Sequence, residues 1–70
     1  MPSNYMFYKV TMEKVIGQKQ GLNGKPENVY RAVTKTGIVR NTPHAFGDLF
    51  RQHSEFLPCV RVVSEEYTQL

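Results

Sequence analysis

Residues 42–53 have the pattern of a short amphipathic helix, which constrains the fold more than any other part of the chain. Thr42 can accept a hydrogen bond from an amide of the first turn, and Pro43 suits the first helical position because its φ angle is already helical. Apolar and aromatic residues recur on one side at helical spacing, namely Phe46, Leu49, Phe50 and His53. Because so short a helix is marginal alone, we expect this side to pack on a sheet.

Residues 5–15 have the alternation of a half-buried strand. We expect the even-numbered apolar side chains to pack against the helix, namely Met6, Tyr8, Val10 and Met12. The odd-numbered side chains are mostly polar. Among them, Phe7 beside Lys9 predicts an aromatic ring on the sheet face away from the helix.

Residues 29–34 are rich in β-forming residues and predict a second strand, whose register the sequence leaves open. In one register Arg31 faces solvent together with Val29 and Val33. In the other register the two valines are buried and Arg31 lies at the rim of the core.

The remaining strands complete a small α+β fold. Residues 35–37 have the composition of a hairpin loop with glycine in the left-handed position, followed by a short strand at residues 38–40. Residues 59–64 predict the last strand. We therefore expect a small antiparallel sheet of three to four strands, in the order β-β-β-α-β, with one helix packed on one face. A crossover through the helix would set the last strand parallel to a neighbour.

The 70 residues predict a single domain, 1–70. Residues 17–28 contain three glycines, a proline and an Asn-Gly pair, and we interpret them as a flexible loop between antiparallel strands. An Asn-Gly pair also favours a tight hairpin turn, but its flanks here lack alternating apolar residues. The two ends, residues 1–4 and 67–70, are expected to be frayed.

Chain length and cysteine content narrow the class of protein. A chain of 70 residues builds a small core with little room for the deep pocket of an enzyme. Its single cysteine, Cys59, cannot form an internal disulfide, which favours a reducing compartment, and we expect a cytoplasmic protein. No stretch has the apolar length of a signal peptide or membrane span, so no membrane association is expected.

No residues of the sequence form a catalytic, cofactor-binding or metal-binding pattern. His44 and His53 are nine positions apart on roughly opposite sides of the predicted helix, whereas metal-binding pairs on helices are closer to four apart. Cys59 has no base near it in sequence and is interpreted as a small buried hydrophobic residue. We therefore expect a protein that is not an enzyme and has no cofactor.

Basic residues are concentrated in the first part of the chain, and the predicted binding surface draws on them. Residues 1–40 contain seven basic and two acidic residues, a net charge of +5, within a chain of net charge +3. Aromatic, apolar and cationic side chains of the strands are the candidates for contact with a partner, namely Tyr5, Phe7, Lys9, Arg31, Val33 and Arg61.

These observations predict a small binding protein that docks on a protein partner and modulates it. By size the chain resembles short accessory or phage-encoded proteins that bind a larger machine. The alternative is a small RNA- or single-stranded-DNA-binding protein, in which Phe7 stacks on a base while Lys9, Arg31 and Arg61 contact phosphates. Homodimerisation would also stabilise so small a core.

Overall fold

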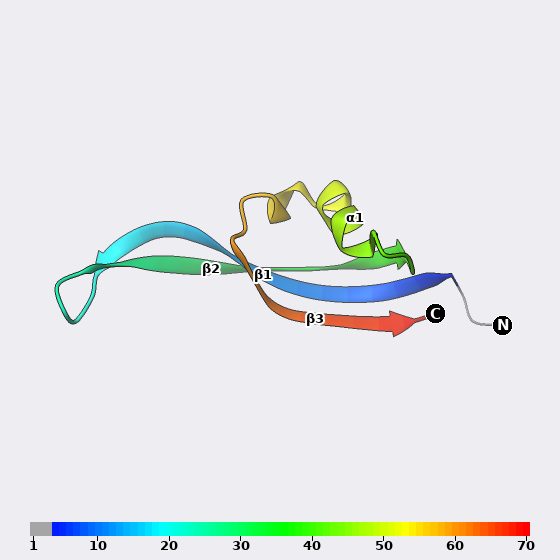
Figure 1. Cartoon of the computed structure of the whole chain (residues 1–70), viewed down its shortest axis with the longest axis horizontal. Coiled ribbons are helices and arrows are strands. Elements are labelled where there is room, and N and C mark those ends of the chain that lie inside the picture. The colour runs from blue at the N-terminus through cyan, green and yellow to red at the C-terminus, as the bar shows by residue number, and fades with distance from the viewer. Residues whose placement is uncertain (1–3) are drawn as a thin grey trace.

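Three antiparallel strands form one sheet, with a single helix on one face (Figure 1). The computed structural model describes residues 4–70. Its elements are β1 (Tyr5–Gln20), β2 (Pro26–Arg40), α1 (Ala45–Gln52), the single 3-10 turn η1 (Ser54–Phe56) and β3 (Arg61–Gln69). Strand β1 is central and pairs antiparallel with both β2 and β3. The predicted α+β class, an antiparallel sheet with one helix, is confirmed.

The predicted hairpin at residues 35–37 is wrong, and residues 38–40 continue β2 without interruption. Gly37 lies directly opposite Tyr8 of β1. A Cβ atom at Gly37 would come within 2.5 Å of the Tyr8 hydroxyl oxygen. The glycine therefore makes room for a tyrosine ring on the neighbouring strand instead of turning the chain.

The predicted loop at residues 17–28 is much shorter in the structure, because its two ends belong to β1 and β2. Only residues 21–25 turn the chain, and Gly24 has a φ of 77°. The Gly24 amide donates to the Gly21 carbonyl at 3.0 Å, and the Lys25 amide donates to the Asn23 side chain at 3.0 Å. The Asn-Gly pair thus forms a hairpin turn, although its flanks are polar.

The chain ends also differ from expectation. Residues 67–69 belong to β3, because they pair with the start of β1. Residues 1–3 lie outside the described residues, so their predicted fraying is not addressed, while the Asn4 carbonyl accepts a hydrogen bond from the Asn41 amide at 2.7 Å. The last strand is antiparallel to its neighbour β1, and because β1 lies between β2 and β3, the crossover through the helix does not set β3 parallel to a neighbouring strand.

Helix α1 begins at Ala45, later than predicted. Thr42 caps a preceding turn instead: its hydroxyl oxygen accepts from the His44 amide at 3.2 Å, and its carbonyl accepts from the Ala45 amide at 3.1 Å. With this start, Ala45 and Leu49 are the buried helical residues, whereas the side chain of Phe46 is exposed. The prediction that the apolar side of the helix is buried is thus confirmed for Leu49, whereas Phe46 lies outside the buried side.

The core lies between α1, η1 and the helix-side face of the sheet. Its buried side chains are Tyr8, Val10, Met12, Val39, Ala45, Leu49 and Phe56. The predicted inward row of β1 is confirmed at these positions. Pairing of Met12 with Val33 and of Lys14 with Arg31 settles the register of β2, because cross-strand partners share a face. Val33 therefore packs against the core, and Arg31 lies on the same face beyond the helix.

A buried hydroxyl ties the end of α1 to both strands of the hairpin. Tyr8 is fully buried, and its hydroxyl donates to the Gln52 side-chain oxygen at 2.6 Å. Because that single proton goes to Gln52, Nε2 of His53 must donate to the same hydroxyl, at 2.8 Å. The Gln52 amide nitrogen in turn donates to the Ile38 carbonyl at 3.0 Å. His53 is therefore a structural residue, as its place on the apolar side predicted.

Ionisation of Tyr67 on β3 is expected to lower the stability of the fold at alkaline pH. Partial burial of a side chain that is still 38% exposed, together with a hydrogen bond to Glu65, raises the pKa of Tyr67 to about 12, against a usual value of about 10. The unfolded chain therefore loses this proton at lower pH than the folded chain. The stability that protonated Tyr67 contributes is fully present below pH 10 and is lost progressively as the pH rises to 12. We expect the free energy of unfolding to fall over this interval, and less steeply in Tyr67→Phe. Urea titrations at several pH values test this; equal slopes for both proteins would contradict it.

The hairpin of β1 and β2 extends far beyond the rest of the sheet. Strand β3 pairs with β1 only from Met6 to Glu13. Residues 14–31, named the arm here, form a two-stranded ribbon that projects past α1 and β3 (Figure 1). The described chain consequently measures 57 × 19 × 17 Å.

Candidate functional site

The sheet face opposite α1, named the open face here, is left uncovered by every helix and strand of residues 4–70 (Figure 1). It carries the odd-numbered side chains of β1 and their cross-strand partners. Phe7 lies between Ile38 and Thr68, and two residues further along β1, Lys9 lies between Thr36 and Glu66. The open face is therefore a three-stranded surface of mixed apolar and polar character.

One end of the open face is an exposed apolar cluster of Tyr5, Phe7 and Ile38. Phe7 and Ile38 are direct cross-strand partners, and Tyr5 is two residues along the same strand as Phe7. The guanidinium carbon of Arg40 lies 6.0 Å from the centre of the Tyr5 ring. Exposed aromatic and branched side chains gathered in one place are typical of interface cores.

Arg61 dominates the other end of the open face. Its guanidinium donates twice to one carboxylate oxygen of Glu13, at 2.7 and 3.0 Å, and lies 4.0 Å above the centre of the Tyr30 ring. The hydrogen bond to Glu13 raises the pKa of Arg61 above its usual range. The charge of this arginine is therefore neutralised by its own sheet and its cationic face is stacked on an aromatic ring.

Four of the six predicted contact residues lie together and two do not. The open face contains Tyr5, Phe7, Lys9 and Arg61. Arg31 and Val33 lie on the helix-side face, so the six predicted residues do not share one surface. Ile38 belongs to the surface, although it is not among the residues predicted from the sequence. Strand alternation through Gly37 would have found it, had that glycine not been interpreted as a turn.

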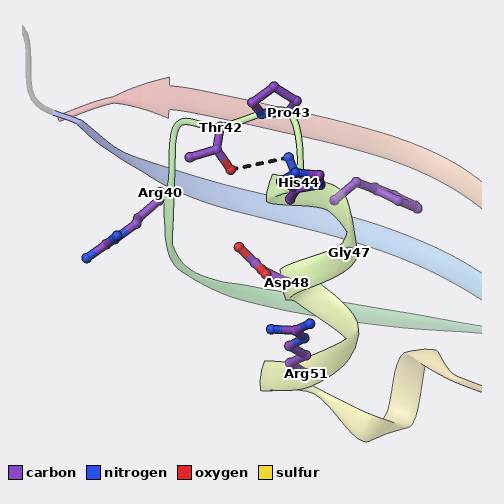
Figure 2. A pocket seen from close by; sticks show the side chains of 8 residues that line it. Arg40, Thr42, Pro43, His44, Gly47, Asp48 and Arg51 are labelled. Carbon is purple, nitrogen blue, oxygen red and sulfur yellow. Dashed lines mark hydrogen bonds between the residues drawn. The ribbon is translucent and has the colours of Figure 1, made fainter.

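A shallow hollow of about 760 Å³ lies beside the start of α1. It is lined by Arg40, Thr42, Pro43, His44, Phe46, Gly47, Asp48 and Arg51. In Figure 2 the Asp48 carboxylate lies between Thr42 and Arg51, and the Arg40 side chain extends away from the helix. The hydroxyl oxygen of Thr42 accepts a hydrogen bond from the His44 amide at 3.2 Å.

The histidines and the cysteine have different surroundings in the fold. His53 bonds to Tyr8 in the core, and His44 is exposed at the start of α1. Cys59 is half-buried against the core, and its thiol lies 3.6 Å from the Glu55 carbonyl. Within residues 4–70, no three histidine, cysteine, aspartate or glutamate side chains gather in a way that could hold a metal ion.

Comparison of the chain with known protein families, characterised proteins and solved structures finds no match. Among the described residues, no helix is both long and apolar enough to span a membrane.

Proposed function

We propose that this protein is a non-enzymatic binding module of the cytoplasm whose open face docks on a protein partner and modulates it. The observation that carries the proposal is the exposed cluster of Tyr5, Phe7 and Ile38 on a sheet face that the described chain leaves uncovered. Its partner is a second, different protein that presents a flat surface of low charge and mainly apolar character.

The charges of the open face favour such a partner. Lys9 lies opposite Glu66, and Arg61 is held by Glu13 at 2.7 Å. Because these cations already face carboxylates, the surface offers little net charge to a polyanion, and apolar contact is the main attraction that it provides.

The alternative of single-stranded nucleic acid on the open face receives less support. That alternative requires Lys9, Arg31 and Arg61 beside Phe7. Arg31 lies on the opposite face and Arg61 is paired with Glu13. Lys9, which lies opposite Glu66, and Arg40, which lies opposite Tyr5, remain for phosphate contacts, whereas binders of this kind line their grooves with several cations.

The size of the open face argues for a different protein over a second copy. The three-stranded part spans the eight β1 residues paired with β3, which is roughly 27 Å by 14 Å, or on the order of 400 Å², from the standard strand spacings. A stable interface buries about 800 Å² on each partner. A face of this size suits a modest, reversible complex better than an obligate dimer.

The sheet and the helix supply a matched pair of variants. Phe7 on the open face is 41% exposed, and Phe46 on α1 is 39% exposed. With a tagged chain as bait in a lysate of its source cells, we expect Phe7→Glu to lose a partner that the unmodified chain and Phe46→Glu both retain. Loss with Phe46→Glu, or retention with Phe7→Glu, would contradict the proposal.

Sedimentation velocity of the purified chain provides the second readout. We expect a monomer at micromolar concentration, unchanged by Phe7→Glu. A dimer that Phe7→Glu dissociates would assign the open face to a second copy of this chain, and would overturn the proposal of a different protein.

A further inference from the structure

The arm is a strand pair that extends without a third strand or a covering helix. Beyond Val15 its residues are exposed, apart from the half-buried Gly21 and Val29. Isolated two-stranded ribbons are marginally stable in water, so a long one gains from a partner that holds it. The arm is distinct from the apolar cluster of the open face, which lies at the opposite end of β1.

Charge is unevenly placed on the arm. It contains four cations, Lys14, Lys19, Lys25 and Arg31, and a single acidic residue, Glu27, which lies opposite Lys19 and leaves the arm a net charge of +3. Lys14 and Arg31 are direct cross-strand partners, an arrangement that destabilises a sheet when both residues carry the same charge.

Carboxylates elsewhere in the described chain do not bond to this pair. Glu55, the nearby acidic group that interacts with Lys14 at longer range, is in contact with Lys35 at 2.7 Å. Neither of the two described ion pairs, Lys35–Glu55 and Arg61–Glu13, includes Lys14 or Arg31. An anionic partner would therefore reduce the repulsion between Lys14 and Arg31, which the pairing of their strands holds side by side.

We propose that the arm binds duplex DNA, entering the major groove while its four cations contact phosphates. The B-form major groove, about 12 Å wide, admits a two-stranded β-ribbon, whereas the corresponding groove of duplex RNA is too narrow. Gln18 and Asn28, whose side chains are hydrogen-bonded at 3.1 Å, lie on the ribbon face opposite Lys19 and Arg31 and offer donors and acceptors to base edges from that face.

Single-stranded nucleic acid fits the arm less well. Binding of single strands depends on aromatic rings that stack on successive bases. Within the arm Tyr30 is the sole aromatic residue, and its ring is covered by the Arg61 guanidinium at 4.0 Å. The arm thus provides cations and amides, the groups that contact the backbone and the groove of a duplex.

Salt dependence gives the test its scale. If four phosphates are neutralised, the slope of log affinity against log salt concentration is about −3.6, so affinity falls roughly 150-fold between 50 and 200 mM salt. We would measure this with the full chain and a fluorescently labelled 20-base-pair DNA duplex by anisotropy. A duplex RNA and a single-stranded DNA of the same length serve as competitors.

Two double variants of equal charge change decide where binding occurs. Lys19→Gln with Lys25→Gln removes two cations from the arm, and Lys9→Gln with Arg51→Gln removes two exposed cations elsewhere. We expect the first to reduce the slope to about −1.8 and the second to leave it unchanged. All four positions are exposed, and circular dichroism verifies the fold.

Several results would overturn the proposal. These are the absence of binding to the DNA duplex at 50 mM salt, an unchanged slope in the arm variant, an equal effect of the control variant, and equal or tighter binding of the RNA duplex or the single strand. Phe7→Glu should leave DNA binding unchanged, so the arm and the open face are tested independently.

Discussion

Replacement of Leu49 by alanine is expected to lower the free energy of unfolding by about 2–5 kcal/mol. Leu49 is fully buried where α1 meets the sheet, in the same cluster as Tyr8 and Val10. A domain of 70 residues has a total stability of roughly 4–10 kcal/mol, so the substitution should remove a large part of it. Urea denaturation followed by circular dichroism measures the change.

Leu57 provides the matched control for this substitution. It directly follows η1, eight residues after Leu49, but its side chain is 66% exposed. Leu57→Ala should change the free energy of unfolding by no more than about 0.5 kcal/mol. If the two alanine variants were equally stable, α1 would not pack on the sheet as described.

Gly37→Ala is expected to be nearly as damaging, although it adds a single methyl group. The added Cβ would lie 2.5 Å from the Tyr8 hydroxyl oxygen and 2.8 Å from the ring carbon that carries it. The ring must then move, and its hydrogen bonds to Gln52 and His53 are strained or lost. Overpacking and the unpaired buried hydroxyl together predict a loss of about 2–5 kcal/mol.

Gly17 supplies the control for the glycine substitution. It lies in β1, whereas Gly37 lies in β2, and no atom would come within 4 Å of a Cβ at Gly17. Gly17→Ala should therefore have little effect on the thermal midpoint, while Gly37→Ala lowers it strongly. Equal midpoints for the two variants would mean that the Tyr8 ring does not lie over Gly37.

The sequence predicts the parts of this fold that local patterns determine. Alternation in β1 gives the buried row of Tyr8, Val10 and Met12, because one side of that strand meets the helix. Helical spacing gives Leu49 as a core residue. The start of α1 is displaced because Thr42 forms a turn of its own before the first helical residue.

What the sequence does not predict depends on contacts between distant residues. Gly37 has the local setting of a turn, and only the ring of Tyr8, 29 positions earlier, explains why the strand continues. The arm lacks apolar alternation, so its polar strands resemble a loop. The register of its two strands continues the pairing of Met12 with Val33 in the three-stranded part of the sheet. The turn at Gly24 closes the hairpin.

The candidate site was predicted in part for the same reason. Phe7 and Lys9 follow from the alternation of β1. The face on which Arg31 lies stays open in the sequence because the register of its strand is set by the whole hairpin. Ile38 is not among the predicted residues because residues 35–37 predict a hairpin loop, with a separate short strand after it. The neutralisation of Arg61 by Glu13 joins β3 to β1 and could not be seen from the local sequence.

The central claim, that the face opposite α1 is the surface that a protein partner contacts, is tested most directly by calorimetric titration of the identified partner. The measured quantity is the ratio of the dissociation constants of Phe7→Glu and Phe46→Glu. Loss of an interface aromatic costs about 2 kcal/mol or more, so we predict that Phe7→Glu binds roughly 30-fold more weakly than Phe46→Glu. A ratio near one, or weaker binding by Phe46→Glu, would contradict the account.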